Sequence, residues 1–155
     1  QRELIPFQKA IHQKVATIMP AHVLYTHLDS RNPATLSQSI LKKLLREKLG
    51  FKGVVVSDDL CMEGIARLGL LEDLAVEAFR AGIDVPLICQ SLEKHGDVME
   101  NFCQQLSRSH FLQKHFKETQ HRLNLLRRRF GLTRRKTLSF KGALPGKKEL
   151  RAFSV

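Results

Sequence analysis

Cysteine is scarce in this sequence, and long apolar runs are missing. The three cysteines, Cys61, Cys89 and Cys103, are odd in number and lack CxxC spacing. This pattern disfavours a disulfide framework or a zinc site and indicates reduced thiols of a cytoplasmic protein. There is no run of about 18 apolar residues and no charged-then-apolar leader, so we expect neither a membrane span nor a signal peptide in the sequence as it stands. The first residue is Gln1 and not methionine, which leaves open that an upstream segment has been removed.

A phosphate-binding loop is missing as well. Residues 54–59 resemble the magnesium-binding strand of P-loop ATPases, but that function requires the pattern GxxxxGK[ST], which does not occur. The nearest approach, residues 142–148, has its glycines too close together, and Pro145 removes an amide. A carboxylate cluster for a metal or a phosphoacceptor would need acids at other strand ends, whereas Asp84 lies at the start of its strand. We therefore expect no metal site.

Acidic residues are rare near the C-terminus. Residues 122–155 hold eleven of the 26 Lys and Arg but only one of the 15 Asp and Glu, so most of the net charge of +11 lies there. We predict one domain over residues 1–130 and a basic, solvated, mobile extension over residues 131–155. The charge also leaves a different class of function open. In that alternative, the chain is a non-enzymatic binding module whose basic tail contacts nucleic acid or an anionic membrane.

Residues 53–60 are the stretch around which the rest of the sequence is organised. A run of valines ends abruptly in Asp58 and Asp59, which is typical of a strand buried on both faces in a parallel sheet. Side chains alternate across a strand, so Asp58 shares a face with Val54 and Asp59 lies on the other face. Ligands bind at the carboxyl ends of parallel strands, so one of the two acids is a candidate catalytic residue. We expect Asp59 to cap the following helix instead.

The order of helical and strand patterns predicts an α/β fold with a parallel sheet. Pro20 and Pro86 interrupt two of the strands, because proline lacks the N–H that a strand ladder uses. Three strands do not close a barrel, and a (β/α)₈ barrel needs roughly 250 residues. The chain is thus a small open sheet or the last part of a barrel. We expect helices at residues 3–13, 37–49, 70–81, 92–107 and 111–130, strands at 15–23, 54–59 and 83–89, and a polar turn at 62–64.

A longer pattern resembles a known family. Its motifs are Ile18-Met19-x-Ala21-His22-Val23, Asp29, Pro33-Ala34-Thr35-Leu36-Ser37, Leu45-Arg46-x-x-Leu49-Gly50-Phe51-x-Gly53-Val54-Val55-x-Ser57-Asp58-Asp59-Leu60-x-Met62 and Ala81-Gly82-x-Asp84. This pattern is similar to the catalytic domain of glycoside hydrolase family 3, in the branch of bacterial β-N-acetylglucosaminidases (β-hexosaminidases) that act on cell-wall muropeptides. The match covers roughly residues 3–107. The resemblance implies a (β/α)₈ TIM barrel of which this chain holds about the sixth to eighth strands.

The resemblance also implies roles for three residues. Asp58 falls on the catalytic nucleophile, and a carboxylate nucleophile forms a covalent intermediate in glycosyl transfer. Met62 falls on a position that lines the sugar pocket, and His22 lies at the mouth end of a neighbouring strand, where it could contact substrate. The general acid/base of this branch, a His on a mobile loop, precedes the sixth strand and is not in this sequence. The resemblance implies a carbohydrate substrate, no cofactor, a missing N-terminal half of the barrel, and little or no activity of this chain alone.

Overall fold

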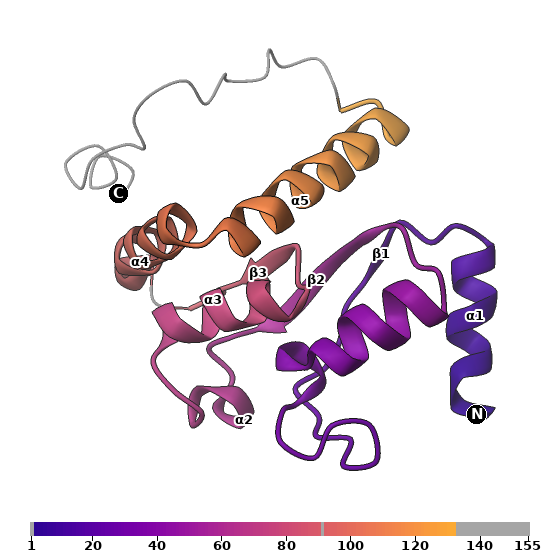
Figure 1. The fold of residues 1–155 in the computed structure, drawn as a ribbon, viewed down its shortest axis with the longest axis horizontal. Coiled ribbons are helices and arrows are strands. Elements are labelled where there is room, and N and C mark those ends of the chain that lie inside the picture. The colour runs from indigo at the N-terminus through magenta and orange to yellow at the C-terminus, as the bar shows by residue number, and fades with distance from the viewer. Residues whose placement is uncertain (1, 91, 133–155) are drawn as a thin grey trace.

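In the part of the chain that the structure describes, three parallel strands form a sheet. The computed structural model describes residues 2–90 and 92–132. The strands are β1 (Thr17–Ile18), β2 (Val54–Asp59) and β3 (Val85–Leu87), in the spatial order β1-β2-β3. Thr17 pairs with Val54 on one side of β2, and Val56 pairs with Val85 on the other, both in parallel register. The predicted α/β class with parallel strands is confirmed, and β2 is the central strand (Figure 1).

Helices connect the strands and follow the last one (Figure 1). Their bounds in the described residues are η1 Arg2–Leu4, α1 Ile5–His12, η2 Ala34–Leu36, η3 Ser39–Lys48, α2 Glu63–Ala66, α3 Leu71–Ala81, η4 Leu92–Lys94, α4 His95–Arg108 and α5 His110–Arg129. The end of α3 shows why the sequence pattern located it well. Gly82 follows the helix with a φ of 129°, a conformation that side-chain-bearing residues rarely adopt.

Four of the expected segments differ from the structure. The first strand is only Thr17–Ile18 and does not extend over residues 15–23, because Pro20 cannot donate to a ladder. The strand expected at residues 83–89 is likewise short, Val85–Leu87. The expected polar turn after β2 contains the short helix α2, Glu63–Ala66. The helix expected at residues 37–49 is present as the π-helix η3, in which Leu49 N donates to Leu44 O five residues earlier.

Pro86 makes the ladder between β2 and β3 irregular. Val56 pairs with Val85, but the next pair is Asp59 with Leu87, so β2 holds one residue more than β3 between the two pairs. Pro86 has no N–H to donate, and the amide of Leu87 donates to the Ser57 hydroxyl at 2.8 Å instead of to a backbone carbonyl. Irregularities of this kind re-aim side chains near functional sites. This one lies beside Asp58.

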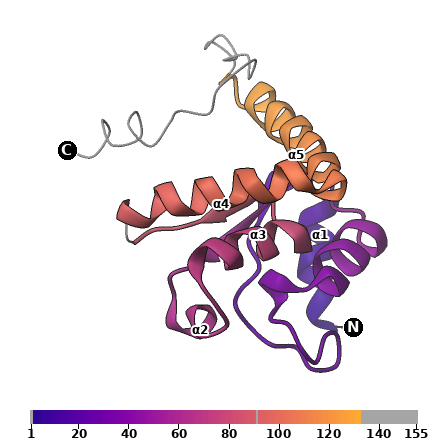
Figure 2. The same cartoon turned by 60° about the vertical axis from the view of Figure 1, so that its left-hand side comes forward.

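The core lies between the sheet and the helices that follow its strands. One face of β2 contributes Val55, which is fully buried. It packs in a cluster with Leu41, Leu45, Phe51, Leu60, Ile65, Leu74, Ala75, Ala78, Ala81, Ile83 and Val98. In a second cluster, Val76, Phe79 and Leu112 join α3 to α5, and Phe79 meets the Phe102 ring of α4 edge-on at 5.0 Å. Figure 2 shows α4 and α5 as two long helices set at an angle to each other.

A buried carboxylate, Asp84, holds the amino ends of β2 and β3 to two helices. Asp84 Oδ2 accepts from Arg46 Nη2 at 2.6 Å and from the Val55 amide at 2.8 Å. Its Oδ1 accepts from Thr119 Oγ1 at 2.7 Å and from Arg122 Nε at 2.9 Å. Burial lowers the pKa of Arg46, and the charge of Asp84 opposes that shift. The Asp84 side chain is fully buried. It lies at the amino end of β3, away from the carboxyl end where ligands bind, so we assign it a structural role.

Gly53 immediately precedes β2, and the surrounding atoms leave no room for a side chain at this position. A Cβ on Gly53 would collide with Ala16 O and lie 2.6 Å from Phe51 Cζ, whereas a Cβ on Gly64 would meet nothing within 4 Å. We expect Gly53→Ala to lower the free energy of unfolding by about 1–3 kcal/mol, because the backbone must shift. Gly64→Ala, the matched control, should be neutral or raise it by up to about 1 kcal/mol. Urea unfolding measures both, and equal stability of the two variants would contradict this packing.

Some expectations lie outside what the structure tests. Residues 133–155, most of the predicted basic extension, are outside the described residues. The boundary near residue 130 and binding of the tail to nucleic acid or membrane therefore stay predictions. Among the described residues, no helix combines the length and the apolar character that crossing a membrane requires. The three cysteines are free thiols, and the cytoplasmic location inferred from their pattern stays a prediction.

Candidate active site

Asp58 lies one residue before the end of β2, at the carboxyl edge of the sheet. Its neighbours in β2, Val55 and Ser57, are fully buried against the helical layer. Strand alternation alone assigns Asp58 to the opposite face, with Val54 and Val56, but the irregularity of the ladder lies between Val56 and Asp59. The side chain is partly exposed, and its Oδ1 accepts one hydrogen bond, from the Asp59 amide at 2.9 Å. No cation among the described residues pairs with Asp58.

Asp59 has a different environment, and its predicted role as a helix cap is wrong. The residue that precedes α2 is Met62, which makes no side-chain cap. Asp59 Oδ1 instead accepts from the amides of Cys61 and Cys89, each at 3.0 Å. Burial raises the pKa of Asp59, but the two amides, the Cys61 side chain and His22 lower it, and the pKa is lowered overall. Asp59 thus joins the segment after β2 to the segment after β3.

His22 is brought to the same edge of the sheet by the chain that follows β1. Its Nε2 lies 2.9 Å from the carbonyl oxygen of Asp59, and its Nδ1 lies 2.8 Å from Thr35 Oγ1. A carbonyl oxygen only accepts, so Nε2 carries a proton, and in the neutral ring Nδ1 accepts from the Thr35 hydroxyl. Both ring nitrogens are used within the protein, and His22 holds this segment against the end of β2. Its role as a substrate ligand stays a prediction.

Met62 stands at the rim of this edge. It precedes α2 with an extended backbone, and its amide donates to Asp59 O at 3.1 Å. The residue is 46% exposed. This is a large fraction for an apolar residue that lies three positions after the end of β2. Its side chain is thus available to a ligand near Asp58. Sugar contact by Met62 stays a prediction.

The loop between β1 and η3 is fixed by Asp29. Its carboxylate accepts from the Ser37 hydroxyl at 2.7 Å and from the amides of Arg31 and Asn32, each at 3.0 Å. The Ser37 hydrogen bond and these amides lower the pKa of Asp29 to about 2. The Ile40 amide donates to Ser37 Oγ at 3.2 Å, which is the contact expected of Ser37 at the start of the next helix, although Gln38 is the residue that immediately precedes η3. The loop therefore has a defined shape.

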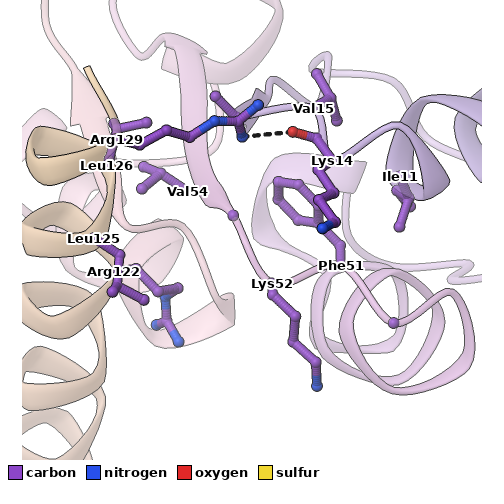
Figure 3. A pocket seen from close by; sticks show the side chains of 13 residues that line it. Ile11, Lys14, Val15, Phe51, Lys52, Val54, Arg122, Leu125, Leu126 and Arg129 are labelled. Atoms are coloured by element: carbon purple, nitrogen blue, oxygen red, sulfur yellow. Dashed lines mark hydrogen bonds between the residues drawn. The ribbon is translucent and has the colours of Figure 1, made fainter.

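A cavity of about 340 Å³ lies at the other end of the sheet. It is lined by Gly53 and Val54, by the end of α1 and by the second half of α5, where Arg129 Nη1 donates to Lys14 O at 2.6 Å (Figure 3). Val54 and Asp58 are separated by about 13 Å at 3.3 Å per strand residue. The cavity is therefore distinct from the edge that carries Asp58, and we do not assign catalysis to it.

Comparison with known proteins identifies the family. Residues 1–126 match the model of the glycosyl hydrolase family 3 N-terminal domain. This chain belongs to glycosyl hydrolase family 3. The chain is 42% identical over 129 residues to a β-hexosaminidase of Haemophilus influenzae and 41% identical over 100 residues to one of Neisseria meningitidis. The alignments cover 82% and 64% of this chain.

Solved structures agree with the family assignment. A family 3 β-N-acetylglucosaminidase from Paenibacillus superposes with a TM-score of 0.78 at 30% identity, over 96% of this chain and 29% of that protein. The β-N-acetylglucosaminidase of Thermotoga maritima gives a TM-score of 0.73 at 29% identity, over 80% and 28% of the two chains. This family 3 chain thus has a TIM-barrel-like α/β fold. It spans 35% and 27% of the Haemophilus and Neisseria relatives.

Sequence reasoning missed the contacts that hold the edge of this family 3 sheet together. Thr35, which contacts His22, and the amides of Cys61 and Cys89, which contact Asp59, were not singled out for these roles. The sequence contained one indication of these contacts. Pro86 removes a hydrogen-bond donor from the ladder, so the hydrogen bonds beside Asp58 must be arranged differently. The other contacts join residues far apart in the chain, and no local pattern reports them.

Proposed function

We propose that this chain is the last part of the catalytic barrel of a retaining β-N-acetylglucosaminidase, with about the sixth to eighth strands, and that Asp58 is its nucleophile. The observation that carries the proposal is the position of Asp58 at the carboxyl end of the central parallel strand in a family 3 chain. Active sites of TIM barrels are built at that end of the strands.

The environments of the two adjacent acids favour Asp58 over Asp59. Asp59 Oδ1 is held by two amides, and hydrogen bonds of this kind stabilise a carboxylate and lower its nucleophilicity. Asp58 accepts a single hydrogen bond among the described residues, from the Asp59 amide, so fewer donors compete with an electrophile for its carboxylate than for that of Asp59. Asp58 would attack the anomeric carbon and form a glycosyl–enzyme ester while the leaving oxygen takes a proton from an acid. Water would then release the sugar with the same anomeric configuration.

The substrate class follows from the relatives, which are named β-hexosaminidase and β-N-acetylglucosaminidase. We propose terminal β-N-acetylglucosamine, with cell-wall muropeptides as the natural source. In this proposal the exposed Met62 packs on the sugar. His22 fixes the neighbouring segment and presents its ring to the same space.

The isolated chain is expected to be inactive. The acid/base histidine that the resemblance implies belongs to a segment before the sixth strand and is not in this sequence, and general acid–base catalysis contributes about 10²–10⁴-fold. It also spans only about a third of its relatives, so the N-terminal half of the barrel is its proposed partner. Incubation of the purified 155-residue chain with a chromogenic β-N-acetylglucosaminide should release no chromophore above a buffer control. Turnover with saturation kinetics would contradict this expectation.

A chimera tests the proposed function itself. The segment of the Haemophilus β-hexosaminidase that aligns over 129 residues is replaced by the matching segment of this chain. We expect the chimera to hydrolyse the chromogenic β-N-acetylglucosaminide, with the unmodified Haemophilus enzyme as the reference. Circular dichroism and thermal unfolding establish that the chimera is folded. A folded chimera without turnover would overturn the proposal.

A further inference from the structure

The backbone amides of two cysteines meet at one carboxylate oxygen just beyond the ends of β2 and β3. The amides of Cys61 and Cys89 each lie 3.0 Å from the same oxygen, Asp59 Oδ1. The two nitrogens are therefore within about 6 Å of each other, which places the two backbones side by side, as a disulfide with its Cα–Cα distance of about 4.4–6.8 Å requires. Twenty-seven residues separate them in the sequence, so only the fold brings them together.

The Cys61 thiol also contacts the segment that carries Cys89. Cys61 Sγ donates to the carbonyl of Gln90, the residue after Cys89, at a sulfur–oxygen distance of 3.7 Å. Cys61 is partly exposed and Cys89 is exposed, so a small reagent can reach both. The pKa of Cys89 is raised, first by partial removal of its sulfur from water and then by the negative charges of Asp59, Cys61 and Asp58.

We propose that Cys61 and Cys89 form a dithiol site that a low-molecular-weight disulfide, such as glutathione disulfide, converts into an internal disulfide. The thiolate of one cysteine attacks a sulfur of the oxidant, one glutathione thiolate leaves and takes up the proton, and a mixed disulfide forms. The second cysteine then attacks the protein sulfur and releases the second glutathione. Two protein thiols are oxidised and one glutathione disulfide is reduced, so atoms and electrons balance.

The cross-link would join two segments that flank Asp58. The segment after β2 carries Met62, and the segment after β3 begins at Ile88. In the reduced protein these segments are held by Asp59 through two hydrogen bonds. A disulfide would hold them covalently until a thiol reduces it. The inference rests on the positions of the two thiols and does not depend on glycosidase activity.

The test uses the full chain carrying Cys103→Ala, so that the third cysteine on α4 cannot react. The protein is incubated with glutathione disulfide and about 0.1 mM reduced glutathione, and intact mass and thiol content are measured. We expect a mass loss of about 2 Da with loss of both thiols. The internal disulfide should exceed the glutathione adduct by at least about tenfold, because adjacent thiols face an effective concentration of millimolar or more. Peptide mapping should find Cys61 linked to Cys89.

Single-cysteine variants provide the matched controls. In the same background, Cys61→Ser and Cys89→Ser should each end as the mixed glutathione disulfide, with no loss of about 2 Da. A trivalent aryl arsenoxide, which bridges two neighbouring thiols without oxidation, should bind the Cys103→Ala protein at least about tenfold more tightly than either single-cysteine variant. Glutathionylation of both thiols without a cross-link, or equal arsenical binding by all three proteins, would overturn the proposal.

Discussion

Replacing Asp58 with asparagine in the chimera is expected to lower kcat/KM for a chromogenic β-N-acetylglucosaminide by at least about 10⁴-fold, as found when a hydrolase loses its nucleophile. Asparagine has nearly the shape of aspartate and can keep the contact with the Asp59 amide. It cannot form the glycosyl ester, however, because its amide oxygen is a weak nucleophile. Steady-state kinetics of the two chimeras measures the effect, and thermal unfolding should give the same midpoint for both.

Asp59→Asn is the matched control for Asp58→Asn. Its amide oxygen can still accept from Cys61 and Cys89, so the loops stay joined while the charge is lost. A hydrogen bond to a charged acceptor is worth about 1 kcal/mol more than a neutral one. Two such bonds weaken by about 2 kcal/mol together, so we expect Asp59→Asn to lower kcat/KM by no more than about 30-fold, since 1.4 kcal/mol corresponds to a factor of ten. Equal losses in the two variants would contradict the separation of roles.

Replacing Asp84 with alanine is expected to lower the free energy of unfolding of the chain by about 3–5 kcal/mol, the usual cost of removing one partner from a buried ion pair. The variant leaves Arg46 and Arg122 facing each other without the carboxylate that both contact. It also removes the acceptor of the Val55 amide and the Thr119 hydroxyl. Small domains have a total stability of about 5–15 kcal/mol, so a large share would be lost. Urea unfolding measures the change.

Asp97→Ala is the control for Asp84→Ala. Asp97 lies on the exposed side of α4 and makes no ion pair with a described residue. Surface substitutions of this kind change stability by about 0.5 kcal/mol or less. If Asp84→Ala changed the free energy of unfolding by no more than Asp97→Ala, the Asp84 cluster would not contribute to stability as its contacts indicate.

The sequence predicts those parts of the fold that depend on local pattern. The valine run before Asp58 predicts a buried parallel strand, and β2 is that strand, central in a parallel sheet. The apolar spacing that ends at Gly82 predicts α3, since the helix and its left-handed end are both local properties. The fully buried Val54 and Val55 also fit a strand that is covered on both faces.

The parts that the sequence did not predict depend on contacts between distant residues. The prediction that Asp59 caps a helix used only its position before a helical pattern. The structure gives its carboxylate the amide of Cys89, thirty residues later. Asp84 likewise meets Arg122 on α5, a contact that no spacing in the sequence indicates. The shortness of β1 reflects Pro20, whose effect on strand length depends on the neighbouring strand.

The most direct test of the central claim is to identify the residue that bonds to the sugar. The chimera is treated with a fluorinated N-acetylglucosaminide whose glycosyl–enzyme intermediate hydrolyses slowly, and the digest is analysed by tandem mass spectrometry. The account predicts one glycosyl label per chain, on the carboxyl group of Asp58, and none in Asp58→Asn. A label on Asp59 or on another residue, or steady turnover with inversion at the anomeric carbon and no label, would contradict it.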